Sequence, residues 1–229
     1  MSNILRFSML VLVIVLTSNE KSYADNKNIY LRVDFGIPYY NKLSNDYDKA
    51  RLHKGQFYNI GLGYKFDNKI RSDITLSRLN KAKFSFSDNS SNQNFESKSH
   101  FNVNSTVAMA NIYYDLINKD KFNIYVGSGV GVSQNSVDNY LSDVKSKLTL
   151  AADPVIKMYN KSNKNCSFAY GISIGTSFKI TNSSFINLGY KYYDLGTIKH
   201  EKIPGIKTSK DLKSSLRAHT INFGLRVFL

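Results

Sequence analysis

Eight segments of this sequence alternate, residue by residue, between large apolar side chains and polar or small ones. The last segment is the most regular: every second residue from Ile221 to Leu229 is apolar, and Asn222, Gly224 and Arg226 lie between them. A period of two indicates a β-strand with one apolar face and one mixed face. Eight such faces must be covered, either by packing as a sandwich or by lipid around a closed barrel.

Long and short connections between these segments alternate along the chain. The segments are residues 28–38, 55–66, 70–84, 100–116, 122–134, 167–180, 184–198 and 215–229. Polar stretches at 40–54, 85–99, 135–165 and 199–214 are expected to be long loops, and 67–68, 118–120 and 181–182 short turns. Outer-membrane barrels have short periplasmic turns and long extracellular loops. The sequence therefore predicts an all-β fold: an eight-stranded antiparallel transmembrane β-barrel, an up-and-down meander with four extracellular loops.

Proline, glycine and aromatic residues favour the barrel over a soluble sandwich. Pro38, Pro154 and Pro204 fall at a strand end or in a loop, where no ladder donor is needed. Ten of the 13 glycines fall on inward positions, which relieves crowding in a narrow barrel. They are Gly36, Gly61, Gly63, Gly127, Gly129, Gly131, Gly171, Gly175, Gly189 and Gly224. The rings expected to form an interfacial girdle beside the short turns are Tyr64, Phe66, Tyr114, Phe122, Phe178 and Phe185.

The N-terminal segment has the pattern of an export signal. A basic start at Arg6 precedes an apolar run at residues 7–16, and Ser22-Tyr23-Ala24 offers a small-x-small cleavage site. The run is shorter than the roughly 20 residues that span a bilayer. We expect residues 1–24 to be a cleaved signal peptide and residues 25–229 to form the barrel. A short N-terminal anchor is the alternative.

Charge and cysteine content narrow the class of protein further. The net charge is +14 and the pI about 9.6, which favours anionic partners. Nucleic acid is the usual partner of such a chain, but the export signal argues against it, and we expect no nucleic-acid binding. The single cysteine, Cys166, excludes an internal disulfide. Stability is expected to come from the closed hydrogen-bonded barrel in lipid.

Charged residues at inward positions are expected to form a barrel-interior network. They are Arg32, Asp34, Lys65, Arg71, Asp73, Asp115, Lys191 and Arg226. Charges in a narrow lumen are expected to pair, because an unpaired buried charge is costly. A selective pore lined by basic residues is the alternative. Eight strands leave room for side chains and not for an aqueous channel, which favours a filled lumen.

No motif in the sequence supports catalysis. His53, His100, His200 and His219 are scattered without metal-ligand spacing, and the nucleophile-elbow, phosphate-loop and zinc-protease motifs do not occur. His219 follows Ser214 and Ser215 closely, which leaves a lipid-modifying enzyme as an alternative. We expect a non-enzymatic protein without metal or cofactor.

Lysines gather in the third and fourth expected loops. They are Lys145, Lys147, Lys157, Lys161 and Lys164 in the third and Lys199, Lys202, Lys207, Lys210 and Lys213 in the fourth. This basic rim is expected to bind an acidic host glycan or an acidic segment of a host protein, or lipopolysaccharide phosphates. The alternative is a set of loops that only keep the surface polar. Helical spacing in the third loop predicts a short amphipathic helix from Val137, Tyr140, Leu141, Val144 and Leu148.

Three motifs at successive strands resemble the opacity-type family of small outer-membrane barrels. They are Asn-Ile-Tyr-Tyr-Asp at 111–115, Tyr-Val-Gly-Ser-Gly-Val-Gly at 125–131 and Leu-Gly-Tyr-Lys-Tyr-Tyr-Asp-Leu-Gly at 188–196. The opening Tyr-Leu-Arg-Val-Asp at 30–34 is similar to the rickettsial branch of surface antigens and adhesins. Strands of this family usually close on Phe, which the barrel-assembly machinery reads, whereas Leu229 follows Phe228 here.

The resemblance implies a location and a partner. It implies a barrel in the bacterial outer membrane, in contact with membrane lipid and lipopolysaccharide, whose loops face the cell exterior. It implies an adhesin that binds a host serum or matrix protein such as vitronectin. A structural barrel or a small-solute porin is the alternative function.

Overall fold

Ten strands make up the described part of the chain. The computed structural model describes residues 28–41, 51–52, 55–88, 95–146, 155–159, 163–200 and 212–229. Within these, it describes only the backbone at 51–52, 81–88, 95–101, 137–146, 155–159, 163, 198–200 and 212–214. The expected signal peptide lies outside the described residues and stays a prediction. No helix among the described residues has the length and apolar character needed to cross a membrane.

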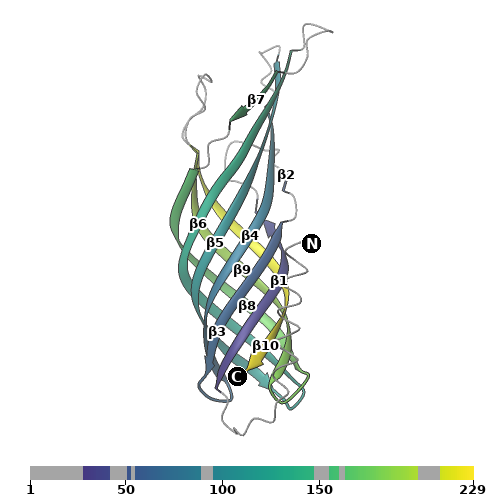
Figure 1. Ribbon diagram of the computed structural model, residues 1–229, viewed down its shortest axis with the longest axis vertical. Coiled ribbons are helices and arrows are strands. Elements are labelled where there is room, and N and C mark those ends of the chain that lie inside the picture. The colour runs from purple at the N-terminus through teal and green to yellow at the C-terminus, as the bar shows by residue number, and fades with distance from the viewer. Residues whose placement is uncertain are drawn as a thin grey trace.

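Eight of the strands close an antiparallel barrel, and two short strands extend it (Figure 1). The barrel strands are β1 (Ile29–Tyr40), β3 (Gln56–Lys65), β4 (Ile70–Asp88), β5 (Phe95–Asn118), β6 (Phe122–Ser146), β8 (Asn163–Lys179), β9 (Ser184–His200) and β10 (Leu212–Phe228). Each pairs with the next along the chain, and β10 pairs with β1. The short β2 (Arg51–Leu52) pairs with β4, and β7 (Val155–Tyr159) pairs with β6. The predicted eight-stranded meander is confirmed.

The barrel closes along nearly the whole length of its first strand. The β1–β10 ladder runs from Tyr30 opposite Phe228 to Tyr40 opposite Ala218. At its end the Leu229 N–H donates to the Ile29 carbonyl at 3.0 Å. A closed ladder leaves no sheet edge unpaired, which is the condition for crossing a lipid layer with strands.

The predicted alternation of faces is confirmed on the barrel wall. Outward apolar side chains such as Ile74 and Phe168 are 72% and 64% exposed, whereas inward neighbours such as Asp73 and Ala169 are buried. Tyr64 and Phe66 pack edge to face at 5.1 Å beside a short turn. The prediction that Phe185 joins this girdle is wrong, because its ring packs against Arg226 and Phe228, at the inner side of the wall.

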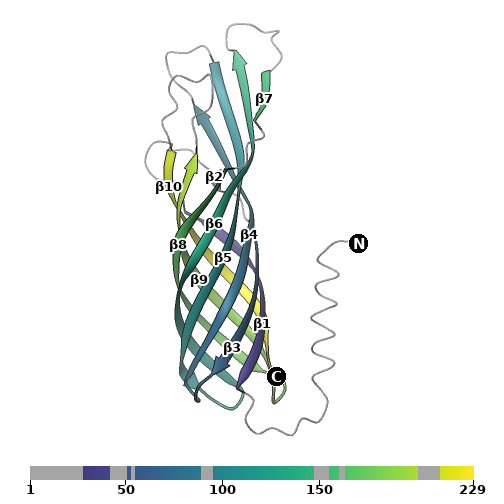
Figure 2. The same ribbon diagram turned by 60° about the vertical axis from the view of Figure 1, so that its left-hand side comes forward.

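Strands β4, β5 and β6 are much longer than the sequence pattern predicts, and they continue beyond the rest of the barrel (Figure 2). Residues 85–88 and 95–99, expected to be a loop, belong to β4 and β5. The predicted amphipathic helix is also wrong, because residues 137–146 belong to β6 and pair with β5 and β7. Pairing on both edges outweighs a local helical spacing. Leu148 lies outside the described residues.

Register irregularities mark where this outer sheet leaves the barrel. The β4–β5 ladder shifts between Leu79 and Ala82, and the β5–β6 ladder between His100 and Asn102. Such bulges bend a strand and increase its twist. We call the paired parts of β2, β4, β5, β6 and β7 beyond these shifts the outer sheet.

Candidate functional site

Two regions of the barrel bear on function: the lumen, which decides whether solutes pass, and the outer end, which a partner can reach. In the lumen, Arg32 is the centre of a charge network. Its Nε donates to Asp34 at 2.7 Å, its Nη1 lies 3.7 Å from a carboxylate oxygen of Asp73, and Nη1 donates to the Tyr113 hydroxyl at 3.1 Å. All four side chains are buried. Strands β1, β4 and β5 are thereby joined across the lumen.

Amide and hydroxyl groups also donate to the two carboxylates of this network. Asn59 donates to Asp34 at 2.6 Å. Asp73 accepts from Asn111 at 2.8 Å and from the hydroxyl of Tyr113 at 3.2 Å. Hydrogen bonds of this kind offset part of the desolvation cost of a buried ion pair.

A second pair lies nearer the short turns. Arg71 contacts Asp115 at 3.4 Å, and Asn123 donates to the other carboxylate oxygen at 2.8 Å. The Arg71 guanidinium also lies against two rings, 4.6 Å from the Tyr113 centroid and 4.5 Å from that of Tyr125. Stacking on aromatic faces is favourable for a desolvated arginine.

Three of the inward cations are placed differently. Arg226 is buried, and the described residues offer it no carboxylate within ion-pair distance; it lies over the rings of Phe185, Tyr30 and Phe228. Lys191 is buried with its Nζ 5.7 Å from the Tyr193 centroid. Lys65 is only half-buried at the short-turn end of β3, and the structure does not bring it into the network.

Inward glycines give these side chains their room. A Cβ at Gly224 would overlap the Asp34 carboxylate, and a Cβ at Gly175 would approach the Tyr125 hydroxyl to 2.5 Å. Close approach between a strand backbone and a large neighbour is a usual reason for glycine inside a strand.

Sequence reasoning missed the apolar half of the lumen. Toward the outer end of the barrel, many of the inward positions form one buried hydrophobic cluster. Its members are Tyr40, Phe57, Leu79, Val103, Val107, Met109, Ala169, Tyr193, Leu195, Leu216 and Ala218. The signal was present in six strands, β1, β3, β4, β5, β9 and β10, whose inward side chains become apolar toward the outer end. A polar layer and an apolar layer therefore lie in series in the lumen.

At a bulge in β9, side chains of β6 and β8 donate hydrogen bonds to the β9 backbone at the outer rim. Gly196 has φ +73°, and the β9–β10 register shifts between Ser215 and Arg217. The pairing of β9 with β8 ends at Asp194, opposite Tyr170. Beyond it, Asn135 donates to the Leu195 carbonyl at 2.8 Å and Asn165 to the Thr197 carbonyl at 2.8 Å. Side chains of β6 and β8 thus replace missing ladder bonds, as buried carbonyls require.

The lysines expected in loops are divided between strands and the part of the chain outside the described residues. Lys145, Lys157, Lys164, Lys199 and Lys213 lie on β6, β7, β8, β9 and β10, so the loop prediction is wrong for these five. Lys147, Lys161, Lys202, Lys207 and Lys210 lie outside the described residues. Of the five on strands, Lys164 has a described side chain, and it is exposed.

Strand register separates these lysine positions into two kinds. In the outer sheet, Lys145 lies opposite Glu96 and Lys98 opposite Asp143. At the outer ends of β9 and β10, Lys199 lies opposite Lys213. Directly opposite positions in an antiparallel pair have Cβ atoms about 5 Å apart, and like charges there are unfavourable.

The alternative of a lipid-modifying enzyme would use His219 together with a nearby serine, and the structure does not bring His219 close to Ser215. The His219 Nδ1 is 2.5 Å from the Tyr190 hydroxyl, and its ring lies 5.1 Å from that of Tyr192. Four residues of strand separate it from Ser215, which corresponds to ~13 Å. The described residues contain no group of three or more His, Cys, Asp or Glu that could hold a metal.

Known structures share this fold. Neisserial surface protein A matches over 88% of this chain and 97% of its own, with a TM-score of 0.51 at 19% identity. The outer membrane protein OprG of Pseudomonas aeruginosa covers 89% and 97%, with a TM-score of 0.50 at 12% identity. At these identities the likeness concerns the fold alone.

Relatives in sequence include rickettsial surface proteins. A Rickettsia bellii protein, named as a candidate adhesin, is 28% identical over 91% of this chain and 92% of its own length. The outer membrane protein PagN of Salmonella typhimurium is 31% identical over 45% of this chain. The match covers less than half of the relative's own length in two cases: 41% of PagN and 45% of a Rickettsia conorii relative.

The family itself follows from a match over nearly the whole chain. Residues 8–227 match the family model described as the outer membrane protein beta-barrel domain. This match, together with the closed eight-stranded barrel and the exposed apolar side chains on its outward face, places the protein in the bacterial outer membrane. The chain belongs to the outer membrane protein beta-barrel domain family.

Proposed function

We propose that this protein is a non-enzymatic surface adhesin whose outer end binds an acidic host ligand, a segment of a serum or matrix protein or an acidic glycan. The observation that carries the proposal is the position of Lys199 directly opposite Lys213 at the outer ends of β9 and β10. Two like charges at opposite ladder positions are unfavourable in the free protein. Binding of a carboxylate or sulfate there removes the repulsion and gains an attraction.

The outer sheet supports this role as a scaffold. β4, β5 and β6 continue past the rim as paired strands, with β2 and β7 alongside (Figure 2). Sites for binding are often carried by segments that a rigid scaffold holds clear of the membrane. The name of the full-length Rickettsia bellii relative points in the same direction.

The test compares lysines that differ in the residue opposite them. Intact barrels displayed on bacteria are measured for attachment to immobilised vitronectin and to heparan sulfate. Lys199→Gln with Lys213→Gln is expected to weaken attachment to the preferred ligand about ten-fold, as two exposed charge contacts of up to about 1 kcal/mol each allow. Lys98→Gln with Lys145→Gln, whose opposite residues are Asp143 and Glu96, removes the same two charges and is the matched control.

The proposal fails if the Lys199→Gln, Lys213→Gln variant attaches like the parent at equal surface display, or if the Lys98→Gln, Lys145→Gln control weakens attachment equally. The second result would indicate that only net charge matters. Raising the salt concentration is expected to weaken the parent more than the Lys199→Gln, Lys213→Gln variant, because exposed charge contacts are screened.

The rival porin function has a direct test in the layered lumen. A hydrophobic cluster lies in series with buried ion pairs, and hydrated solutes would have to displace both. We expect negligible conductance when the folded protein is inserted in planar bilayers. Steady single-channel currents would favour the porin over the adhesin.

A further inference from the structure

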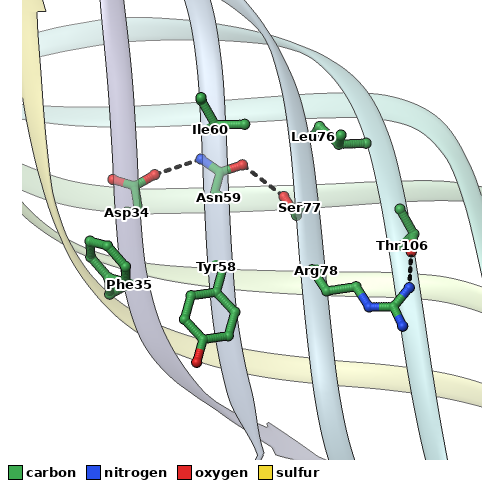
Figure 3. Close-up of a pocket in the computed structure, with 9 residues that line it drawn as sticks. All are labelled: Asp34, Phe35, Tyr58, Asn59, Ile60, Leu76, Ser77, Arg78 and Thr106. Atoms are coloured by element: carbon green, nitrogen blue, oxygen red, sulfur yellow. Dashed lines mark hydrogen bonds between the residues drawn. The ribbon is translucent and has the colours of Figure 1, made fainter. Parts of the chain in front are cut away.

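The outward wall of β1, β3, β4 and β5 is hollowed near its outer border. A cavity of about 250 Å³ is lined by Asp34, Phe35, Tyr58, Asn59, Ile60, Leu76, Ser77, Arg78 and Thr106. Figure 3 shows these side chains on four neighbouring strands. Asp34, Asn59 and Ser77 are inward residues that hydrogen-bond to one another along the back of the cavity. The six others lie on the outward face.

The outward residues of this cavity lie in two rows set by strand register. Phe35 lies opposite Tyr58, Tyr58 opposite Arg78, and Arg78 opposite Thr106, which forms one row across four strands. The next row toward the short turns contains Ile60 opposite Leu76. The row nearer the short turns is thus aliphatic, and the row nearer the outer end contains a guanidinium and hydroxyl groups. We call the two rows together the wall groove.

The position of Arg78 along the strand corresponds to the edge of the hydrocarbon layer. It follows Ile70, the first residue of β4, by eight residues. A strand rises about 3.3 Å per residue and tilts by about 40°, so Arg78 lies ~20 Å above the short turns. The outward apolar band of such barrels is about 25 Å tall. The backbone of Arg78 therefore lies about 5 Å below the outer edge of that band, and its long side chain can extend to headgroup level. Leu76 and Ile74 below it face acyl chains.

Arg78 keeps its charge available at that level. Its Nε donates to Asn80 at 2.8 Å and its Nη1 donates to the Thr106 hydroxyl. Both partners are neutral, and no carboxylate among the described residues lies within ion-pair distance of Arg78. Arg217, the other outward arginine with a described side chain, is neutralised by Asp194 at 3.1 Å. The wall groove thus combines an apolar floor with an uncompensated cation that two hydrogen bonds hold in place.

We propose that the wall groove binds one lipid of the outer leaflet, with an acyl chain along Ile60 and Leu76 and a phosphate monoester on Arg78. A planar guanidinium forms two parallel hydrogen bonds to a phosphate. The hydrophobic floor alone would accept any acyl chain, so Arg78 supplies the headgroup preference. This site lies on the wall below the rim, and it is independent of the adhesive surface proposed above.

The absence of tryptophan from the sequence makes a contact test available. A Tyr58→Trp variant carries a single tryptophan in the wall groove, and lipids brominated on their acyl chains quench it on contact. The folded protein is placed in phosphatidylcholine vesicles in which part of the lipid is brominated phosphatidylcholine or brominated phosphatidic acid. We expect phosphatidic acid to bind about five-fold more tightly, as one cation near a membrane surface allows.

Two further substitutions assign the preference to Arg78. Arg78→Gln in the Tyr58→Trp background is expected to bring the preference close to one. Arg217→Gln is the matched control, because it removes an outward arginine that Asp194 already neutralises, and it is expected to leave the preference unchanged. An Ile172→Trp reporter, on the exposed face of β8, is expected to show no comparable preference.

Three results would overturn the proposal. They are equal quenching by the two lipids, an unchanged preference in Arg78→Gln, and the same preference at the Ile172→Trp reporter, which would indicate general attraction to a basic protein. Folding is checked by the heat-dependent shift in gel mobility. If Tyr58→Trp does not fold, Ile60→Trp places the reporter in the aliphatic row, and the same three comparisons decide.

Discussion

The two halves of the lumen hold the barrel together by different means. The half near the short turns contains Arg32, Asp34 and Asp73 in one buried network and Arg71 with Asp115 in another. The half near the outer end contains a hydrophobic cluster that includes Phe57, whose ring lies 6.1 Å from that of Tyr193. Both halves consist of buried side chains, although their chemistry is opposite.

The contrast indicates what each half contributes. A hydrophobic cluster gains free energy from burial but imposes little geometry, because many packings are nearly equivalent. Ion pairs with fixed hydrogen-bond partners gain less net free energy but allow few arrangements. The polar half is therefore expected to specify strand register across the lumen, and the apolar half to add stability and exclude water beneath the outer sheet.

Removing one carboxylate from the polar half is expected to have the largest effect. Asp34→Ala leaves Arg32 without its 2.7 Å partner and Asn59 without its acceptor. Breaking a buried pair on one side costs about 3–5 kcal/mol. The free energy of unfolding from lipid vesicles in urea measures this. A loss below about 1 kcal/mol would mean that the network contributes little.

Truncation in the apolar half is expected to cost somewhat less. Leu79 is fully buried within the cluster, and Leu79→Ala leaves a cavity that costs about 2–5 kcal/mol. The same urea titration applies. Ile74→Ala, on the lipid-facing side of the same strand and 72% exposed, is the control and is expected to lose far less. Equal losses would indicate that the lumen cluster is loosely packed.

A paired replacement sharpens the distinction between stability and specificity. Arg71→Met with Asp115→Leu removes both charges of the second pair. The free energy of unfolding of this double variant is expected to stay within about 2 kcal/mol of the parent's, because no other buried charge loses an ion-pair partner. Each single substitution is expected to cost more than the pair. If the polar half specifies register, the double variant folds more slowly or into more than one form on native gels. A single, parent-like band and refolding rate would contradict that role.

The sequence predicts the barrel well because lipid imposes the same rule on every strand. Outward residues such as Ile74, Val132 and Phe223 must be apolar wherever they lie, so period two survives along the whole wall. It also identifies the cations and carboxylates of the lumen. The sequence does not show which cation pairs with which carboxylate. Arg32 pairs within its own strand and across to Asp73, while Arg226 packs against aromatic rings.

The outer end is harder to predict because lipid no longer constrains it. Beyond the membrane, lipid does not select apolar residues for one face of each strand, and alternation weakens, as in residues 137–146, whose spacing suggests a helix. Their pairing with β5 and β7 decides the structure. The Lys199–Lys213 position follows from strand register, which composition alone does not provide. Register in turn depends on the β9 bulge at Gly196.

The smallest expected effect lies outside the lumen, in the short turn between β3 and β4. The Asp67 carboxylate accepts the N–H groups of Lys69 and Ile70, both at 2.6 Å. These two backbone hydrogen bonds lower the pKa of Asp67. A lowered pKa in the folded state means that the ionised carboxylate stabilises the turn at pH values above the ordinary aspartate pKa. This stabilisation is lost as the pH falls through the lowered pKa.

Asp67→Ala is therefore expected to unfold slightly more easily than the parent at neutral pH. The difference is expected to disappear in strong acid, and urea midpoints measured from neutral pH downward follow it. A difference that persists unchanged in acid would show that the carboxylate charge has no part in the turn.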